Sequence, residues 1–286
     1  MIQQIKKYTS LVHFAHTVFA LPFALIGFTL AYKVHPPHAV WLLLIQVLVC
    51  MVTARNSAMS FNRYVDRYID ALNDRTKQRE LPAGKLSPNA VLLFFFVNAA
   101  LFIICTYTIN KLCFWLSFPA LTVLCGYSYT KRFTWFSHLV LGLALAIAPA
   151  GAYIAVTGTL TPSVLWLSVM VIFWVGGFDI IYSLPDEQHD RAHKLHSVPQ
   201  RFGRKRALWI SGGLHLLVAP VMVLFGIGID ASWIYWGGAL FFAGMLIYQH
   251  VMVWTECRDG IYPVSTTNGM ASVVFALLTM IDLFVK

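Results

Sequence analysis

Carboxylate side chains gather in two stretches of this 286-residue sequence. In the first stretch, Asn62, Asp66 and Asp70 follow one another at intervals of four residues, and Asp186 and Asp190 repeat that interval in the second. On a helix this spacing places side chains on one face, one above another. Stacked carboxylates repel unless a cation lies between them, and Mg²⁺ commonly binds through one or two carboxylates together with substrate phosphates. The pattern therefore predicts sites for a divalent metal ion.

Basic side chains accompany both acidic stretches and suit the binding of phosphate oxygens. They are Arg55, Arg75, Lys77, Arg79, Lys131, Arg132 and Arg191. Positive-inside placement accounts for most basic residues in a membrane protein. Arg55, Arg79 and Lys131 stand out, because an ionisable group at membrane depth needs a functional partner. Acids and bases at the same helix ends predict a metal-bound diphosphate.

The elements that carry these groups must lie in lipid, since 58% of the residues are hydrophobic and only 12% are charged. Apolar stretches of roughly 20 residues recur along the whole chain. An open sheet cannot satisfy its backbone in hydrocarbon, and the alternation of a barrel is absent. We expect an all-α integral membrane bundle forming a single domain over residues 1–286. About nine transmembrane helices are predicted, at residues 11–32, 38–61, 88–110, 112–130, 136–157, 163–184, 207–229, 232–254 and 264–285.

The distribution of lysine and arginine predicts how the bundle is oriented. Eighteen of the 21 basic residues lie at one set of helix ends, and only Lys33, Lys111 and Lys286 lie at the other. The positive-inside rule then places the N-terminus and the two long acidic loops, residues 62–87 and 185–206, in the cytosol, with the C-terminus outside. Because membrane helices separate the basic residues, no nucleic-acid partner is expected. The five cysteines lack the paired spacing of a disulfide framework or a zinc site.

Four stretches of the chain resemble a known family. NRYVDRYID (residues 62–70), followed by RTKQRELPAG (residues 75–84), resembles the first signature of the UbiA superfamily of intramembrane prenyltransferases. YSYTKR (residues 127–132) and FDIIYSLPDEQHD (residues 178–190) resemble its central and second acidic signatures. Their order and spacing agree over nearly the whole chain, including the nine helices.

The resemblance implies a Mg²⁺-dependent polyprenyltransferase that takes a polyprenyl diphosphate and a small aromatic acceptor from or beside membrane lipid. It implies that Asn62, Asp66 and Asp70 hold one Mg²⁺ and that Asp186 and Asp190 hold another, with the diphosphate bridging them. The residues implied to act directly in catalysis are Asp66, Asp70, Asp186, Asp190 and Lys131. Those implied to bind substrate are Arg55, Arg79, Tyr127, Arg132, Asp179, Tyr182 and Arg191, with Tyr127, Asp179 and Tyr182 at the acceptor end.

Within this superfamily, residues 16–23, 61–63 and 196–203 are similar to the branch that prenylates 4-hydroxybenzoate or a related quinone precursor, and particularly to members of the futalosine route to menaquinone. This similarity implies a bacterial cytoplasmic membrane and an active site facing the cytosol. It leaves open 4-hydroxybenzoate or 1,4-dihydroxy-6-naphthoate as acceptor, the prenyl chain length, the proton acceptor and the oligomeric state. Two residues depart from the pattern: Arg63 stands where many relatives have Asp, and Pro185 precedes Asp186.

Other functions use intramembrane acids. An ion-coupled transporter would place them near the membrane midplane among broken helices, whereas here they cluster at helix ends. A phosphotransferase acting on CDP-linked substrates would need an Asp-Gly start with acids at a set downstream spacing, and this combination is missing. A prenyltransferase for another acceptor, such as haem or chlorophyllide, stays open, and the retained acids argue against a catalytically inactive scaffold.

Overall fold

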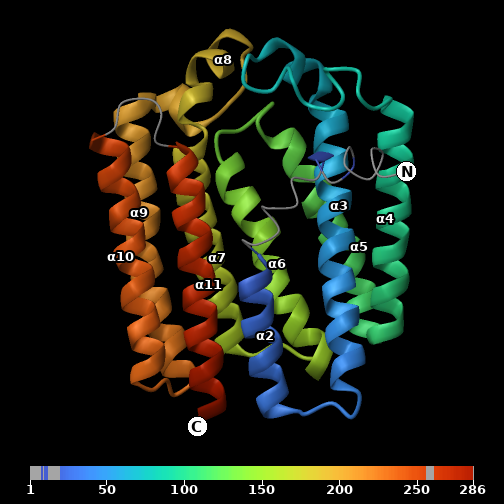
Figure 1. Ribbon diagram of the computed structural model, residues 1–286, viewed down its shortest axis with the longest axis vertical. Helices are drawn as coiled ribbons and strands as arrows, with labels where there is room; N and C mark the ends of the chain where they lie inside the picture. Colours follow the sequence, from blue (N-terminus) through green and yellow to red (C-terminus); the bar gives the residue numbers. More distant parts are fainter. Residues whose placement is uncertain (1–7, 9, 12–19, 256–260, 286) are drawn as a thin grey trace.

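The computed structural model describes residues 20–255 and 261–285, together with residues 8, 10 and 11. Within these residues every regular element is a helix, and eight helices are long and apolar enough to cross a membrane (Figure 1). They are α3 (Val40–Leu72), α4 (Pro88–Ile109), α5 (Lys111–Thr130), α6 (Ser137–Thr157), α7 (Pro162–Tyr182), α9 (Val198–Gly228), α10 (Trp233–Thr255) and α11 (Ile261–Val285). A further apolar helix, α2 (Leu21–Val34), has 14 residues. The predicted all-α membrane bundle is confirmed; the start of its first predicted helix lies outside the described residues.

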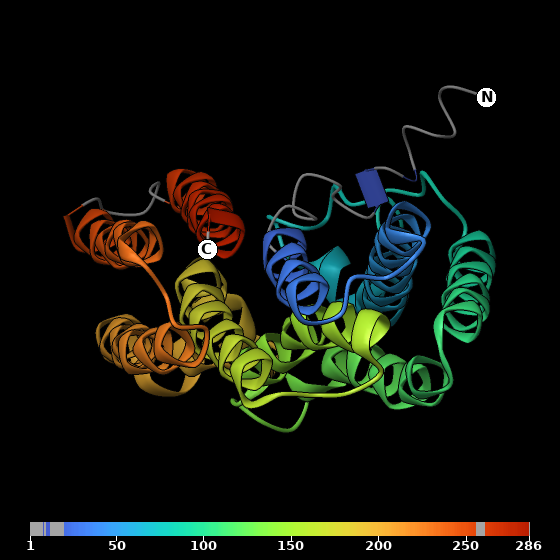
Figure 2. The ribbon, with the colours of Figure 1, turned by 90° about the horizontal axis from the view of Figure 1, so that it is seen from below.

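Helix α6 lies in the middle of the bundle and packs against α2, α5 and α7. On one side α3 contacts α4 and α5. On the other side α7 contacts α9, α10 packs against α11, and α11 contacts α2 (Figure 2). Helices α3 and α7 run in the same direction, so the acidic stretches that finish them meet at one end of the bundle (top of Figure 1). We call this end the acidic end; α11 finishes at the opposite end.

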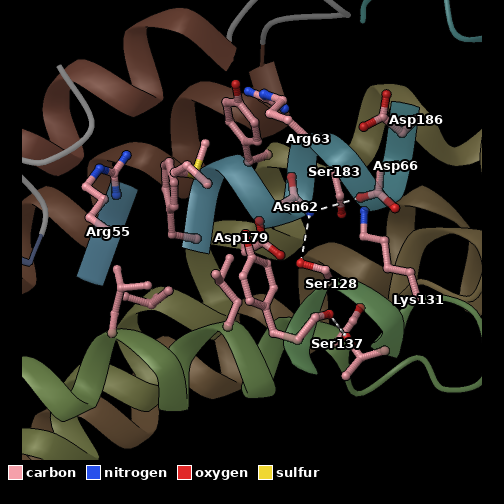
Figure 3. Close-up of a pocket in the computed structure, with 18 of the residues that line it drawn as sticks. Arg55, Asn62, Arg63, Asp66, Ser128, Lys131, Ser137, Asp179, Ser183 and Asp186 are labelled. Carbon is pink, nitrogen blue, oxygen red and sulfur yellow. Dashed lines mark hydrogen bonds between the residues drawn. The ribbon is translucent and has the colours of Figure 1, made fainter. Parts of the chain in front are cut away.

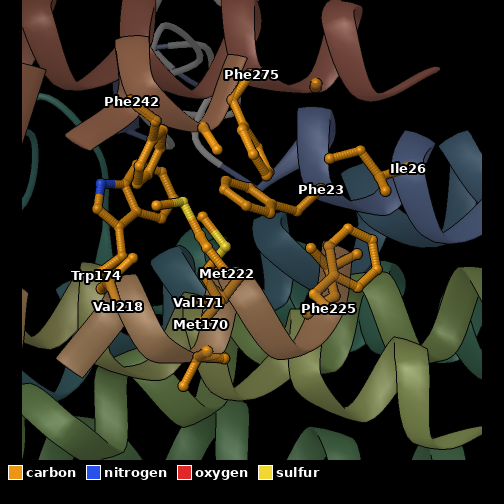
Figure 4. Close-up of a cluster of buried hydrophobic side chains, with 14 of the residues drawn as sticks. Phe23, Ile26, Met170, Val171, Trp174, Val218, Met222, Phe225, Phe242 and Phe275 are labelled. Atoms are coloured by element: carbon orange, nitrogen blue, oxygen red, sulfur yellow. The ribbon is translucent and has the colours of Figure 1, made fainter. Parts of the chain in front are cut away.

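A buried aromatic core joins α2 to the second half of the chain. Phe23, Trp174, Phe242 and Phe275 are fully buried and pack ring against ring (Figure 4). The Trp174 indole N–H donates to Asn268 Oδ1 at 2.8 Å, which satisfies its polar atom within this core. Because lipid tails are as apolar as these side chains, close packing and such hydrogen bonds hold the helices together.

Two helices are longer than the sequence predicts. Helix α3 continues from the predicted end at residue 61 to Leu72, so Asn62, Asp66 and Asp70 stand on a helix and not in a loop. The apolar pattern of the sequence marks only the part of a helix that contacts lipid or the protein core. Helix α3 continues past that part. The backbone ladder continues there, with polar side chains in place of apolar ones.

The second acidic loop is also shorter than predicted. Helix α9 begins at Val198 instead of residue 207, because the Ser197 hydroxyl accepts the N–H of Gln200 at 3.3 Å and caps its first turn. Gly203, with a φ of 77°, kinks α9 where the polar segment meets the apolar one. Before it lie a short 3₁₀ turn, η2 (Leu184–Asp186), and helix α8 (Glu187–Ala192). Pro185 lies within η2, just beyond the end of α7.

Two glycines let neighbouring backbones approach α6 closely. A Cβ atom at Gly27 of α2 would lie 2.3 Å from the carbonyl oxygen of Pro149 in α6. One at Gly142 of α6 would lie 2.4 Å from the carbonyl oxygen of Ile172 in α7. Both contacts are with backbone, which cannot rotate away as a side chain could, so these crossings require glycine.

We therefore expect Gly27→Ala and Gly142→Ala to destabilise the protein by about 1–3 kcal/mol through overpacking. Gly244→Ala in α10 is the matched control, because a Cβ there meets nothing within 4 Å. Thermal unfolding of the three variants in one detergent measures the effect. Unchanged melting of both crossing variants would contradict this account of the helix packing.

Candidate active site

A cavity of about 290 Å³ lies at the acidic end, between α3, α5, α6 and α7 (Figure 3). The predicted site residues that line it are Arg55, Asn62, Asp66, Arg79, Tyr127, Lys131, Asp179, Tyr182 and Asp186. In the view of Figure 3, Arg55 lies on one side of the cavity and Lys131 and Asp186 on the other, with Asp179 between them. The tertiary structure thus brings the four stretches that carry the family resemblance around one hollow.

Helix α3 supplies one wall of the cavity through its helical repeat. The side chains that face the cavity lie seven, eight and eleven residues after Arg55, at Asn62, Arg63 and Asp66. These intervals are close to whole helical turns, so the four side chains lie on one face. Asn62 Nδ2 donates to Asp66 Oδ2 at 2.9 Å and also reaches Ser128 Oγ at 3.4 Å. Arg132 Nη2 lies 3.3 Å from Asp66 Oδ1. Both oxygens of Asp66 are thus held in place by side chains of two different elements.

Asp70 lies one turn further along α3 but does not line the main cavity. It is buried, and its Oδ1 accepts a hydrogen bond from Arg79 Nη1 at 2.7 Å. The Thr76 hydroxyl donates to the Asp70 carbonyl at 2.9 Å, which fastens the turn between the two residues. Asp70 therefore positions Arg79, which does line the cavity, while Asp70 Oδ2 is buried without a partner among the described residues.

Asp186 joins the segment after α7 to the segment after α3. It forms an ion pair with Arg75, and Asn73 Nδ2 donates to its Oδ1 at 3.1 Å, across 113 residues of chain. Burial by itself would raise the pKa of the Asp186 carboxyl, but the hydrogen bond and charge of Arg75 outweigh it and lower the pKa below its ordinary value. The carboxylate therefore stays ionised and available to a cation.

Asp190 and Arg191 occupy different surroundings. Asp190 is buried, accepts a hydrogen bond from Ser197 Oγ at 2.7 Å, and lines a smaller cavity of about 70 Å³ together with Asp66 and Asp186. Arg191 is exposed, pairs with Glu187 at 3.1 Å, and lines neither cavity. The structure thus brings Asp190 close to the other acids but leaves Arg191 at the periphery.

Two further arginines line the cavity: Arg63, and Arg75, which the sequence indicates as a phosphate-binding cation but without a predicted role in the site. Arg63, the departure from the family pattern, is only 4% exposed and lines the cavity. Its Nε has no hydrogen-bond partner among the described residues. Its position eight residues after Arg55 on one helix was the available signal. Arg75 also lines the cavity, and only its pairing with Asp186 distinguishes it from other loop cations.

A second, apolar cavity of about 200 Å³ continues from the first. Arg55, Met59, Tyr127, Leu141 and Leu145 line both, so the two spaces meet at these side chains. Beyond them the lining comes from apolar residues of α3, α4, α5 and α6. The first cavity, which we call the head region, is charged, and the second is apolar. The combined space therefore suits an amphiphilic molecule with an anionic head group.

The donor set suits a metal ion that arrives with a phosphate. Within the described residues, no three His, Cys, Asp or Glu side chains converge on a ready-made metal site. Asp66, Asp70 and Asp186 are instead each paired with an arginine. Mg²⁺ needs only one or two protein carboxylates when substrate phosphates and water complete its shell. Asp66 and Asp186, which come from the two acidic stretches and line the cavity, meet that requirement, and Asp70 Oδ2 has no partner among the described residues.

Comparisons with known proteins agree with this geometry. Residues 20–264 match the model of the UbiA prenyltransferase family. Over 245 residues the chain is 33% identical to a 4-hydroxybenzoate octaprenyltransferase of Vibrio cholerae, covering 82% of this chain and 85% of that protein. A protein of the same name from Aeromonas hydrophila is 32% identical over 240 residues, covering 82% of each chain.

Solved structures share the fold. The apo structure of a UbiA homolog from Aeropyrum pernix K1 superposes with a TM-score of 0.84 at 27% identity, covering 94% of this chain and 98% of that one. A UbiA homolog from Archaeoglobus fulgidus, bound to DMAPP and Mg²⁺, gives a TM-score of 0.73 at 20% identity, covering 98% and 100%. With a family match over most of its length and relatives of this similarity, the chain belongs to the UbiA prenyltransferase family.

Proposed function

We propose that this protein transfers a polyprenyl group from a polyprenyl diphosphate to an aromatic quinone precursor, in a Mg²⁺-dependent reaction. The observation that carries the proposal is the joined pair of cavities, one lined by acids and arginines and the other apolar. Two relatives named 4-hydroxybenzoate octaprenyltransferase support an aromatic acceptor. Homologs bound to DMAPP or GPP with Mg²⁺ support a prenyl diphosphate as donor.

The head region would bind the diphosphate. Asn62, Asp66 and Asp70 on one side, and Asp186 and Asp190 on the other, would hold Mg²⁺, which when bound neutralises charge on the leaving group. Arg55, Arg63, Arg75, Arg79 and Lys131 face the same space from fixed positions. Fixed cations in a site poor in water stabilise the negative charge that builds on the diphosphate as its bond to the allylic carbon breaks.

The apolar cavity would hold the prenyl tail. Beyond the side chains that line both cavities, its lining from α3, α4, α5 and α6 is apolar apart from scattered hydroxyl and thiol groups. Tyr127 and Tyr182 line the head region, where the allylic cation forms and where the faces of aromatic rings stabilise a cation by about 1–2 kcal/mol each. The tail thus sits away from the charged groups while its reactive carbon lies among them.

The acceptor ring would bind near Asp179, Tyr182 and Tyr127, on the α7 side of the cavity. We favour a phenol or naphthol that carries a carboxylate, 4-hydroxybenzoate or 1,4-dihydroxy-6-naphthoate, because cationic side chains border the space. The acids stand at the ends of α3 and α7 and not among broken helices within the membrane, which favours this reading over transport. We place the acidic end on the cytosolic side of a bacterial cytoplasmic membrane, from the distribution of basic residues.

We expect Asp66→Ala and Asp190→Ala each to lower prenylation by about 100-fold or more, because each removes a carboxylate that would hold Mg²⁺ for the diphosphate. Purified protein is assayed with geranyl diphosphate, Mg²⁺ and each candidate ring, and a chelator abolishes product. Asp74→Ala is the control, since this exposed carboxylate pairs only with Lys77 on the surface. Full activity of both cavity variants would refute the assignment.

Arg63→Gln tests the departure from the family pattern. Removing this buried cation should lower kcat/KM for the prenyl diphosphate by about 100-fold, as loss of one charge-stabilising donor typically does. Arg67→Gln, one turn along α3, is the matched control, because Arg67 contacts Tyr64 and Tyr68 and lines no cavity. Equal kinetics of the two variants would show that Arg63 has no role in binding the diphosphate.

Ala148→Phe tests the place of the tail. This residue lines the apolar cavity, so the added ring should block long prenyl diphosphates while geranyl diphosphate still reacts. Ala219→Phe adds the same ring to a separate cavity of about 480 Å³ between α9 and α10 and should leave chain-length preference unchanged. Turnover with donors of increasing length gives the readout. An unaltered length profile in Ala148→Phe would place the tail elsewhere.

A further inference from the structure

A histidine that the sequence did not single out is bonded to an acid of the cavity. His138 of α6 and Asp179 of α7 are joined through Nδ1 and Oδ2 at 2.7 Å. The histidine side chain is 1% exposed, whereas that of Asp179 is 20% exposed and lines the main cavity. The histidine thus lies behind the acid, on the side away from the cavity.

The other ring nitrogen of His138 fixes its protonation. The backbone N–H of Val198, at the first turn of α9, donates to His138 Nε2 at 3.2 Å. First-turn N–H groups lack a partner within their own helix, which explains this capping bond. Since Nε2 accepts, the proton of the neutral ring is on Nδ1, and it is donated to Asp179 Oδ2. The imidazole therefore holds a carboxylate in a fixed orientation and has no free site for a second proton.

Asp179 differs from the other acids of the cavity in its partner. Among the described residues, Asp66 and Asp186 pair with Arg132 and Arg75, whereas Asp179 is bonded to a neutral imidazole and its Oδ1 has no hydrogen-bond partner. Both oxygens of Asp66 and both oxygens of Asp186 accept hydrogen bonds from neighbouring side chains. Within the described residues Asp179 uses only Oδ2 in this way, so its Oδ1 stays available to the space where the acceptor ring would lie.

We propose that Asp179 accepts the proton that the aromatic ring loses, and that His138 is the positioning residue for it. This step rests on the proposed function. A ring carbon bonds to the allylic carbon, and the bond from that carbon to the diphosphate oxygen breaks with its electron pair on the diphosphate. The electrons of the ring C–H bond restore aromaticity, and the proton passes to Asp179 Oδ1. Every atom and electron is accounted for without a further reactant.

The test compares ring-protonated with ring-deuterated acceptor. In the native enzyme we expect the breaking of the allylic bond to be slower than proton loss, and therefore no primary isotope effect. In Asp179→Asn, proton removal becomes slow: kcat should fall by about 100-fold, and a primary deuterium isotope effect should appear. An amide that only misplaced the substrate would lower the rate without any isotope effect.

His138 variants separate positioning from general packing. The amide of His138→Gln can accept from Val198 and donate to Asp179, so it should restore most of the rate with little isotope effect. His138→Leu can do neither and should show both defects. Asp282→Asn is the structural control: this fully buried acid accepts the N–H groups of Ser232 and Tyr235, lines no part of the cavity, and should show no isotope effect.

Two results would overturn the assignment while leaving the proposed function intact. These are full activity of Asp179→Asn, or a loss of its activity with equal rates for the two isotopic acceptors. In either case the bound diphosphate or another group takes the proton. A native enzyme that prenylates no aromatic ring would instead overturn the proposed function, and the assignment of Asp179 with it.

Discussion

Ion pairs between arginine and carboxylate groups hold the two acidic segments against each other, and the rest of the site depends on them. Arg75 reaches Asp186 from the segment after α3, and Arg79 folds back onto Asp70. Several carboxylates this close would repel and lose hydration if each stood alone. The pairing with Arg75 lowers the pKa of the buried Asp186 carboxyl, which therefore stays ionised at the end of a membrane bundle. The same pairing leaves the guanidinium groups and the carboxylates side by side, ready for a phosphate and its metal ion.

The membrane helices hold the charged site in place by close packing. The hydrophobic effect does not draw helices together in lipid, because lipid tails are as apolar as the helix surfaces. Glycines at the crossings of α6 bring α2 and α7 close, and an aromatic core around Trp174 fills the space between α2 and the second half of the chain. Close packing on this side contrasts with the apolar cavity among α3, α4, α5 and α6. The α3 to α6 side of the bundle thus offers room for a long apolar group beside the charged head region.

In the proposed reaction the two cavities hold different parts of the prenyl diphosphate, because one is charged and the other apolar. The diphosphate would stay where arginine, lysine and carboxylate groups meet, and the tail would extend into the apolar space. The acceptor ring would lie between them, near the pair formed by His138 and Asp179. In that arrangement separate sets of side chains would contact the leaving group, the allylic cation and the ring that loses a proton. Bond breaking, bond formation and proton loss could then follow one another without movement of the bound substrates.

The sequence alone predicted the all-helical membrane bundle, because the length of an apolar segment is a local property that decides whether the segment can span the bilayer. It also predicted that acids and bases of distant stretches would share one site, and the cavity brings Asp66, Lys131, Asp179 and Asp186 together. Whether those residues bind metal and substrate stays a prediction. The ends of α3 and α9 escaped the apolar pattern, because both helices extend past the lipid-facing stretch with polar residues.

Only the tertiary structure decided which polar group faces which. Arg63 looked like the loss of an acid, yet it is a buried cation on the cavity wall; Asp70 positions Arg79 instead of lining the main cavity. His138 carried no motif at all, because its partners Asp179 and Val198 come from helices 41 and 60 residues away. Helical spacing fixes the direction of each side chain, whereas its partner depends on how separate helices pack, and no local pattern records that packing.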